Sequence, residues 1–491
     1  MFSSRDTKAD DEKHNNLGVN DQKDVERQQD DITRVVSASS QINTIDGETV
    51  VDGVWGTLEE DAPNYRGLGW IRASVLLVKV QIGLGVLSIP AALDALGLVP
   101  AILIILAVCL VITWADYIVG VFKLHHPEVY TLADVGQIMF GPIGREIFGA
   151  FYWIQLVAVA GAGLLACSVA FNAMSEHGTC TIVFVVVAAV INILISSIQT
   201  LDRISWIGWI GVGGIISSIV TLTVAVAVQD RPSAAPQTGP WDKEVMIFNN
   251  PGFILGISTL SNIIFSFAGT PNFFNVIAEM KNPRDYNKAM GVCQTFVLSC
   301  YLILGCTIYH FCGEYIASPA LGSAGPLMKK VCYGLALPGL IVSCVLNTHL
   351  PAKYVFVRVM RNSRHLSANT ITHRVVWVSC VIGSCAISFV IAEGIPVFSD
   401  LISLIGALIA TPNSIIFEGM MFIYDLHTNP DKYPNRNKWW HKGLEVMNWV
   451  VMIGFGLFAT VAGTYAAAVT IRADVSAGST TQPFSCADNS G

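Results

Sequence analysis

Eleven stretches of about 20 or more mostly apolar residues run through this chain. A helix of that length crosses the hydrocarbon core of a bilayer, at about 1.5 Å per residue. Apart from closed β-barrels, only helices satisfy every backbone N–H and C=O group within lipid. The sequence therefore predicts an all-α integral membrane protein with 11 transmembrane helices. These cover approximately residues 71–96, 98–121, 146–172, 179–199, 204–228, 252–281, 288–312, 326–349, 374–394, 398–423 and 444–471.

The composition agrees with a chain whose solvent is the lipid bilayer, since 53% of residues are hydrophobic and only 13% are charged. The first 61 residues hold 15 Asp and Glu against 6 Lys and Arg. Such a segment buries too little apolar surface to fold alone, so we expect residues 1–65 to form a disordered acidic tail. Its Lys8, Lys13 and Lys23 are candidate ubiquitin acceptors, which suggests contact with a ubiquitin ligase. The acidic excess argues against nucleic acid as a partner.

The loop charges predict the orientation. No basic segment followed by a short apolar one marks a cleavable signal, so we expect the first span to direct insertion. With the N-terminus in the cytoplasm, inner loops and flanks from residue 65 onward carry 17 Lys and Arg. The outer side then carries only five, Arg231, Lys243, Lys329, Lys330 and Arg472. Positive charges concentrate on the cytoplasmic side, so the C-terminal tail, residues 473–491, is predicted to be extracellular.

A long outer connection, residues 229–250, divides the spans into two groups. It contains Pro232, Pro236, Gly239 and Pro240, which suit an irregular loop. Spans one to five, about 71–228, would form one repeat, and spans six to ten, about 252–423, an inverted copy. The span at about 444–471 is an addition. Together they make a transmembrane domain of residues 66–472.

The first span is interrupted by Ile82-Gly83-Leu84-Gly85, followed by Ser88-Ile89-Pro90. Gly83 and Gly85 lack the Cβ that would block a ligand, and Ser88 can cap a restarted helix. Freed N–H groups at the positive end of a half-helix suit a carboxylate. The alternative is a glycine-rich packing face with a proline kink. The candidate substrate contacts here are Ile82, Gly83, Gly85, Val86 and Leu87.

The sixth span contains a matching interruption, Phe265-Ser266-Phe267-Ala268-Gly269-Thr270-Pro271. Gly269 can end one half-helix, Thr270 can cap the next, and Pro271 fits its first turn. Carbonyl groups before Gly269 could accept hydrogen bonds from an ammonium group. Paired breaks at corresponding positions of two repeats are typical of a transport site. The candidate contacts are Phe265, Ser266, Phe267, Ala268 and Gly269, and a zwitterion is the ligand that suits both breaks.

Charged residues inside spans are costly and indicate function. Lys79 lies one helical turn before the first break, where its ammonium group would supply a fixed charge near Ser343 and Asn347 of span eight. The alternative is that its side chain snorkels to the interface. If desolvated, Lys79 could also exchange protons during transport. Asp116 and Glu418 lie deeper than the other acidic residues and are the better carboxylate candidates for a proton relay, and Asp116 is counted with Lys79, Ser343 and Asn347 as a candidate coupling residue. His125-His126-Pro127 is interpreted as a turn.

Enzymatic signatures are absent from the sequence, including the P-loop, H-E-x-x-H, G-x-S-x-G and C-x-x-C patterns. We therefore expect no catalytic activity, no metal and no cofactor. Most of the 12 cysteines lie in apolar stretches and act as small hydrophobic residues. Cys180, Cys312, Cys332 and Cys486 lie at or beyond the outer face, where the sequence allows one disulfide bond without assigning it.

The motifs resemble those of the amino acid/auxin permease (AAAP) family. The run from Ile82 to Ala92 is similar to the pattern G-x-G-(I/V)-L-x-(I/L)-P-x-A, and Glu279-Met280-Lys281-Asn282-Pro283 is similar to E-M-(K/R)-(N/D)-P. The chain is most similar to fungal neutral amino acid permeases of the methyltryptophan-resistance type. The resemblance implies a LeuT-like 5+5 inverted repeat of the APC superfamily plus one extra helix. It also implies that Lys79 occupies the position of the sodium ion in related carriers.

The resulting hypothesis is a secondary active transporter for proton-coupled symport of neutral aliphatic and aromatic L-amino acids across the plasma membrane. Two alternatives stay open. A vacuolar exporter could be built from the same parts, and a sensor could keep the binding site while signalling through the acidic tail. An ion channel is disfavoured because no ring of filter residues is visible.

Overall fold

The computed structural model describes residues 51–52, 56–57, 68–198, 201–232, 234–360, 370–433, 438–477 and 482–490. The chain divides into two compact units, residues 1–64 and 65–491. In the first, a two-stranded antiparallel pair is described, β1 (Val51–Asp52) with β2 (Gly56–Thr57). The rest of the predicted disordered tail, with Lys8, Lys13 and Lys23, lies outside the described residues.

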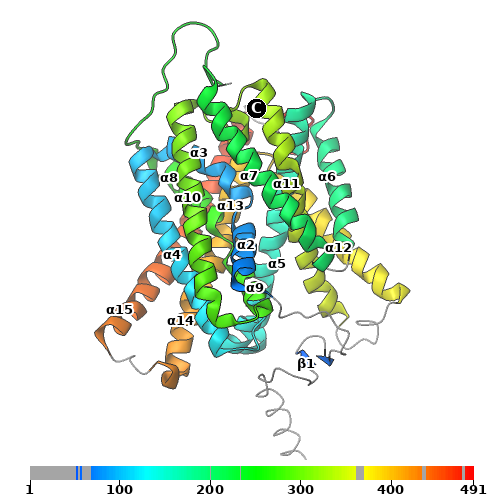
Figure 1. Cartoon of the computed structure of the whole chain (residues 1–491), viewed down its shortest axis with the longest axis vertical. Helices are drawn as coiled ribbons and strands as arrows, with labels where there is room; N and C mark the ends of the chain where they lie inside the picture. The colour runs from blue at the N-terminus through cyan, green and yellow to red at the C-terminus, as the bar shows by residue number, and fades with distance from the viewer. Residues whose placement is uncertain are drawn as a thin grey trace, which may run out of the picture. The chain divides into compact units, whose positions relative to one another are not determined.

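The second unit is helical throughout its described part (Figure 1). Its helices are α2 (Trp70–Gln81), α3 (Ile89–Leu96), α4 (Leu98–His125), α5 (Leu132–Ser175), α6 (Thr181–Ser196), α7 (Leu201–Val228), α8 (Gly252–Phe267), α9 (Phe273–Glu279), α10 (Tyr286–Cys312), α11 (Pro326–Val359), α12 (Ile371–Gly394), α13 (Phe398–Ile405), α14 (Phe417–Thr428), α15 (Trp439–Met447) and α16 (Gly456–Ala477).

The described residues contain eight helices long and apolar enough to cross a membrane, and ten spans when each of two bent helix pairs counts as one. The remaining predicted span corresponds to α6, which has 16 residues. At 1.5 Å per residue, α6 is about 24 Å long, shorter than the hydrocarbon core. The model supports up to ten spans, and the predicted total of 11 depends on α6.

Helix α5 begins earlier than the apolar pattern predicts. Thr131 and Asp134 form a capping box, with the Asp134 carboxylate accepting from the Thr131 N–H at 2.9 Å. Gly141 has a φ of 67°, which few other residues adopt, and Pro142 follows it. The helix therefore bends there and continues through the predicted span, reaching 44 residues in all.

The central elements are those of the first predicted span. Helices α2 and α3 pack against α10, and α3 also packs against α8 (Figure 1). Helix α11 packs against α5 and α7. The tenth predicted span is also bent, by 40°, between α13 with the π-helical segment Gly406–Ala410 and the segment Pro412–Thr428. The bent spans one and ten are thus built from shorter helical segments than their neighbours.

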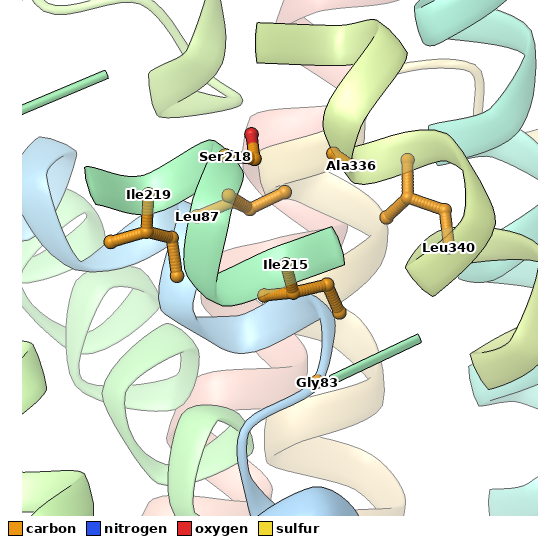
Figure 2. A pocket seen from close by; sticks show the side chains of 7 residues that line it. All are labelled: Gly83, Leu87, Ile215, Ser218, Ile219, Ala336 and Leu340. Atoms are coloured by element: carbon orange, nitrogen blue, oxygen red, sulfur yellow. The ribbon is translucent and has the colours of Figure 1, made fainter. Parts of the chain in front are cut away.

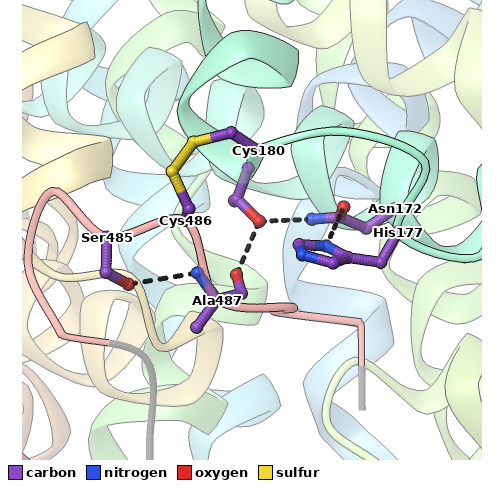
Figure 3. The surroundings of a disulfide bond; sticks show 7 residues. Asn172, His177, Cys180, Ser485, Cys486 and Ala487 are labelled. Atoms are coloured by element: carbon purple, nitrogen blue, oxygen red, sulfur yellow. Dashed lines mark hydrogen bonds between the residues drawn. A yellow bond between two sulfur atoms is a disulfide. The ribbon is translucent and has the colours of Figure 1, made fainter.

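The disulfide bond that the sequence left open joins Cys180 to Cys486, while Cys312 and Cys332 are buried free thiols. It holds the C-terminal segment against the start of α6 (Figure 3). The Thr181 hydroxyl donates to the Ala487 carbonyl oxygen at 2.6 Å. Asn489 donates to the Ser168 hydroxyl at 2.9 Å, so the segment reaches a buried polar group of α5.

Candidate functional site

The first span is interrupted where the sequence predicts. Helix α2 ends at Gln81, a short 3₁₀ segment runs over Leu84–Ser88, and α3 follows at a 50° bend. Ile82 and Gly83 lie between them with non-helical backbone angles. The predicted cap is wrong, because the Ser88 hydroxyl donates to the Gly85 carbonyl oxygen at 2.8 Å instead of capping α3.

The sixth predicted span is interrupted as well. Helix α8 ends at Phe267, a 3₁₀ turn covers Thr270–Asn272, and α9 follows. Pro271 lies in the first turn of that segment, as predicted. Thr270 makes no capping hydrogen bond, because the 3₁₀ turn uses the backbone N–H groups that a cap would satisfy.

The two interruptions touch each other. Ser266 Oγ donates to the Gly85 carbonyl oxygen at 2.9 Å and lies 3.5 Å from Ser88 Oγ. A Cβ added at Gly85 would lie 2.4 Å from the Ser266 Cα. Gly269 packs on the end of α2, with its added Cβ 3.3 Å from the Gln81 Cα. The backbones of the two breaks are therefore in contact at Gly85 and adjacent at Gly269.

The carbonyl groups that we predicted to bind an ammonium group accept hydrogen bonds from side chains. Tyr301 Oη donates to the Ser266 oxygen at 2.6 Å, and Gln155 Nε2 donates to the Ala268 oxygen at 3.2 Å. Gln81 Nε2 lies 3.4 Å from the Phe267 oxygen. These carbonyl oxygens are thus accessible to donors from neighbouring helices, as an amine site requires.

Apolar residues close the rest of this region. Phe265 and Phe267 are buried, and the Phe267 ring meets that of Tyr301 edge to face at 5.0 Å. Ile82, Val86 and Leu87 are buried as well. The structure therefore brings the residues predicted from the two breaks into one dry region between α2, α3, α8 and α10.

A small cavity lies beside the first break (Figure 2). Its volume is about 10 Å³, enough for about one water molecule. Gly83 and Leu87 line it together with Ile215, Ser218 and Ile219 of α7 and Ala336 and Leu340 of α11. An amino acid does not fit a space of this size, so substrate binding here requires the surrounding helices to move apart.

Lys79 is half-buried and lies one turn before the break. Gly83 faces span eight, since an added Cβ there would lie 4.0 Å from Ser343 Oγ. Asn347 donates to the Ser343 carbonyl oxygen at 2.8 Å. The first break and the predicted coupling residues of α11 are therefore neighbours at Ser343.

Asp116 is fully buried on α4, away from the cavity. Gln294 of α10 donates to one of its carboxyl oxygens, and Thr270 lies beside the carboxyl group without making a hydrogen bond. Sequence reasoning missed Gln81, Gln294 and Tyr301. Their signal was weak, since their helices contain several other polar residues and the sequence does not show which of them face the breaks.

Comparison with known proteins identifies the family. Residues 66–466 match the family described as transmembrane amino acid transporter protein. A transmembrane transporter of Gibberella moniliformis is 37% identical over 431 residues, covering 88% of this chain and 90% of that protein. The N amino acid transport system protein of Neurospora crassa is 33% identical over 438 residues, covering 87% and 90%.

A solved structure shares the fold. The nucleobase-cation-symport-1 family transporter MHP1, in a closed conformation with bromovinylhydantoin bound, aligns with a TM-score of 0.51 and 14% identity. The alignment covers 88% of this chain and 98% of MHP1. The family match over residues 66–466 and the two relatives show that this chain belongs to the transmembrane amino acid transporter family.

Proposed function

We propose that this protein is a secondary active transporter that takes up neutral aliphatic and aromatic L-amino acids by proton symport across the plasma membrane. The observation that carries the proposal is the contact between the two broken spans at Gly85 and Ser266. One break supplies backbone N–H groups at the start of a half-helix, and the other supplies carbonyl groups at the end of one. A zwitterion complements this polarity once the two breaks separate.

The binding mode follows from this polarity. The substrate carboxylate binds at Gly85 to Leu87, and its amine takes over the carbonyl oxygens of Ser266 to Ala268 from Tyr301, Gln81 and Gln155. The buried rings of Phe265 and Phe267 favour an apolar substrate side chain. Charged amino acids would bring an unpaired charge into this dry region and are disfavoured.

Lys79 supports a proton-coupled over a sodium-coupled mechanism. The family resemblance puts Lys79 at the position of a coupling ion, and a cationic side chain there would repel a metal cation. The proposal therefore assigns Lys79 the role of a fixed charge between span one and span eight, where it takes the place of a coupling ion.

The disulfide bond supports the proposed orientation. Disulfide bonds persist in oxidising compartments, so the side of the membrane that holds Cys180 and Cys486 faces away from the cytoplasm. This agrees with an extracellular C-terminal tail and a cytoplasmic N-terminal tail, as the loop charges predict.

Uptake by the purified protein in vesicles tests the proposal. An inward proton gradient should drive accumulation of a labelled neutral amino acid, with and without sodium outside. A competition panel of unlabelled amino acids should show inhibition by aliphatic and aromatic ones and none by Lys or Asp. Binding without flux would identify a sensor instead, and a tagged copy in the vacuolar membrane would favour an exporter.

A further inference from the structure

Two carboxyl groups are buried in the centre of the helical unit. Asp116 on α4 and Glu418 on α14 are both fully buried, and the two helices pack together. Asp116 Oδ1 and both Glu418 carboxyl oxygens have no hydrogen-bond partner among the described residues. The ion pairs of the described residues involve neither of them.

Both groups lie well before the ends of their helices. Asp116 lies nine residues before the end of α4 at His125. Glu418 lies ten residues before the end of α14 at Thr428. Both side chains are fully buried in the protein, so neither reaches water by snorkelling.

Hydrogen bonds connect the Asp116 carboxyl group to both broken spans. Gln294 Nε2 donates to Asp116 Oδ2, and Gln294 Oε1 accepts from Gln81 Nε2 at 3.3 Å. The same Gln81 nitrogen lies 3.4 Å from the Phe267 carbonyl oxygen. Gln81 is the last residue of α2 and Phe267 the last of α8. The chain Asp116, Gln294, Gln81, Phe267 thus ends where both half-helices end.

We propose that Asp116 is the proton-binding carboxyl of the transport cycle, that Glu418 is its second carboxyl, and that Gln294 and Gln81 transmit its protonation state to both helix breaks. This inference rests on the proposed proton symport and adds to it the residue at which the proton binds. Lys79 then acts as a fixed charge and does not carry the proton.

The surroundings of Asp116 favour its protonated form. A carboxylate without a cation partner is costly in a dry membrane interior, and a second carboxylate nearby adds repulsion. Asp116 interacts electrostatically with Cys109 of its own helix, Tyr286 and Cys293 of α10, and Glu418 of α14. None of them is a cation, and no ion pair of the described residues involves Asp116, so its complete burial favours the neutral carboxylic acid.

Opening of the site to water removes this penalty. Once hydrated, Asp116 releases its proton as H⁺, and the carboxylate strengthens its hydrogen bond from Gln294. Gln294 then shifts its contact with Gln81, at the end of the first half-helix. One proton binds on one side of the membrane and one leaves on the other, so a neutral zwitterion moves with one positive charge.

The test compares Asp116→Asn, Asp116→Glu and wild type in vesicles. Asparagine mimics the protonated acid but cannot release a proton. Asp116→Asn should therefore lose accumulation driven by a pH gradient and keep pH-independent exchange of labelled for unlabelled substrate. Asp116→Glu should restore gradient-driven accumulation. Accumulation by Asp116→Asn at the wild-type level would overturn the inference.

The matched control is Glu393→Gln on α12. Glu393 is also buried and has an unpartnered Oε1, but it lies at the end of its helix, far along the sequence from both breaks. It should keep gradient-driven accumulation. Loss of coupling in Glu393→Gln as well as Asp116→Asn would show a general effect of buried carboxyls and would overturn the assignment.

The wild type separates this inference from the proposed function. Wild-type protein that shows no proton-driven uptake contradicts symport itself, whatever Asp116 does. If Asp116→Asn does not fold, Gln294→Met tests the link with the carboxyl intact. The pH at which this variant shows half-maximal uptake should differ from the wild-type value by about one unit, because the loss of a hydrogen bond to a charged group shifts its pKa by about that much. An unchanged midpoint would overturn the inference.

Discussion

Gly85 is the residue at which the two broken spans touch. The space there is closed by backbone, since an added Cβ would lie 2.4 Å from Ser266 Cα and 2.7 Å from its Oγ. Backbone moves less readily than a side chain, so even one methyl group must push the two breaks apart. The contact also holds the hydrogen bond from Ser266 to the Gly85 carbonyl oxygen.

Gly85→Ala should therefore abolish substrate uptake. Overpacking of this kind costs about 1–3 kcal/mol, and here the cost falls on the binding site itself. Uptake of labelled substrate by equal amounts of inserted protein measures the effect.

The control is Gly291→Ala on α10, where an added Cβ meets nothing within 4 Å. It should retain wild-type uptake, because alanine favours the helix. Normal uptake by correctly inserted Gly85→Ala would refute the contact as the site.

Lys79 allows a second test at this scale. Lys79→Met keeps the length of the side chain and removes its charge, so uptake should fall sharply because the fixed charge between spans one and eight is lost. Lys79→Arg retains the charge and should retain more activity. Uptake by Lys79→Met at the wild-type level would favour snorkelling as the role of this lysine.

The sequence predicted some of these residues and not others, for a physical reason. Gly83, Gly85 and Gly269 stand out because glycine and proline interrupt a helix in lipid, where interruptions are costly. Tyr301, Gln81 and Gln294 do not, since their role depends on which helix faces each break. That neighbour relation is set by the packing of α2 and α3 on α10.

At the scale of elements, the ends of α4 and α14 are joined by a polar cluster around Asp425. His125 Nδ1 contacts Asp425 Oδ2, and His126 Nε2 lies 3.4 Å from Asp425 Oδ1. Tyr433 Oη and Asn429 Nδ2 each donate to the same carboxylate at 2.7 Å. Sequence analysis interpreted His125-His126-Pro127 as a turn only, because Asp425 is 300 residues away.

Asp425→Asn should destabilise the protein, since Asp425 is almost fully buried and its donors would lose their anionic acceptor. Loss of one partner of a buried charged cluster costs about 3–5 kcal/mol. A lower melting temperature in detergent, measured by tryptophan fluorescence, checks this. The exposed Asp431→Asn is the matched control and should melt like wild type. Equal melting temperatures for both variants would contradict a structural role for the cluster.

Helix boundaries were less predictable than helix breaks. The beginning of α5 at Leu132 is not visible in hydropathy, because the polar and glycine-containing segment before residue 146 dilutes the apolar signal. The capping box of Thr131 and Asp134 is the signal that could have located it. Conversely, the sequence predicted a full span where α6 has only 16 residues.

At the scale of the whole molecule, the helix breaks in spans one and six are the feature of the fold that the sequence predicts most directly. They lie in the first predicted span of each proposed repeat, and both reach the centre of the helical unit. The overall fold is similar to that of MHP1 at 14% identity, so the fold tolerates extensive change in sequence. The inverted repeat itself stays a prediction.

The bond between Cys180 and Cys486 has a consequence for the covalent connectivity of the protein. The two cysteines are 306 residues apart, so α6 to α16 and all their loops lie within one closed ring. A protease site placed in the outer connection between α7 and α8 opens this ring at one point. The cut chain should stay a single species on a gel without reductant and separate into two fragments with it. Two fragments without reductant would contradict the ring. A single backbone cut anywhere within this ring therefore leaves both fragments of the chain covalently joined.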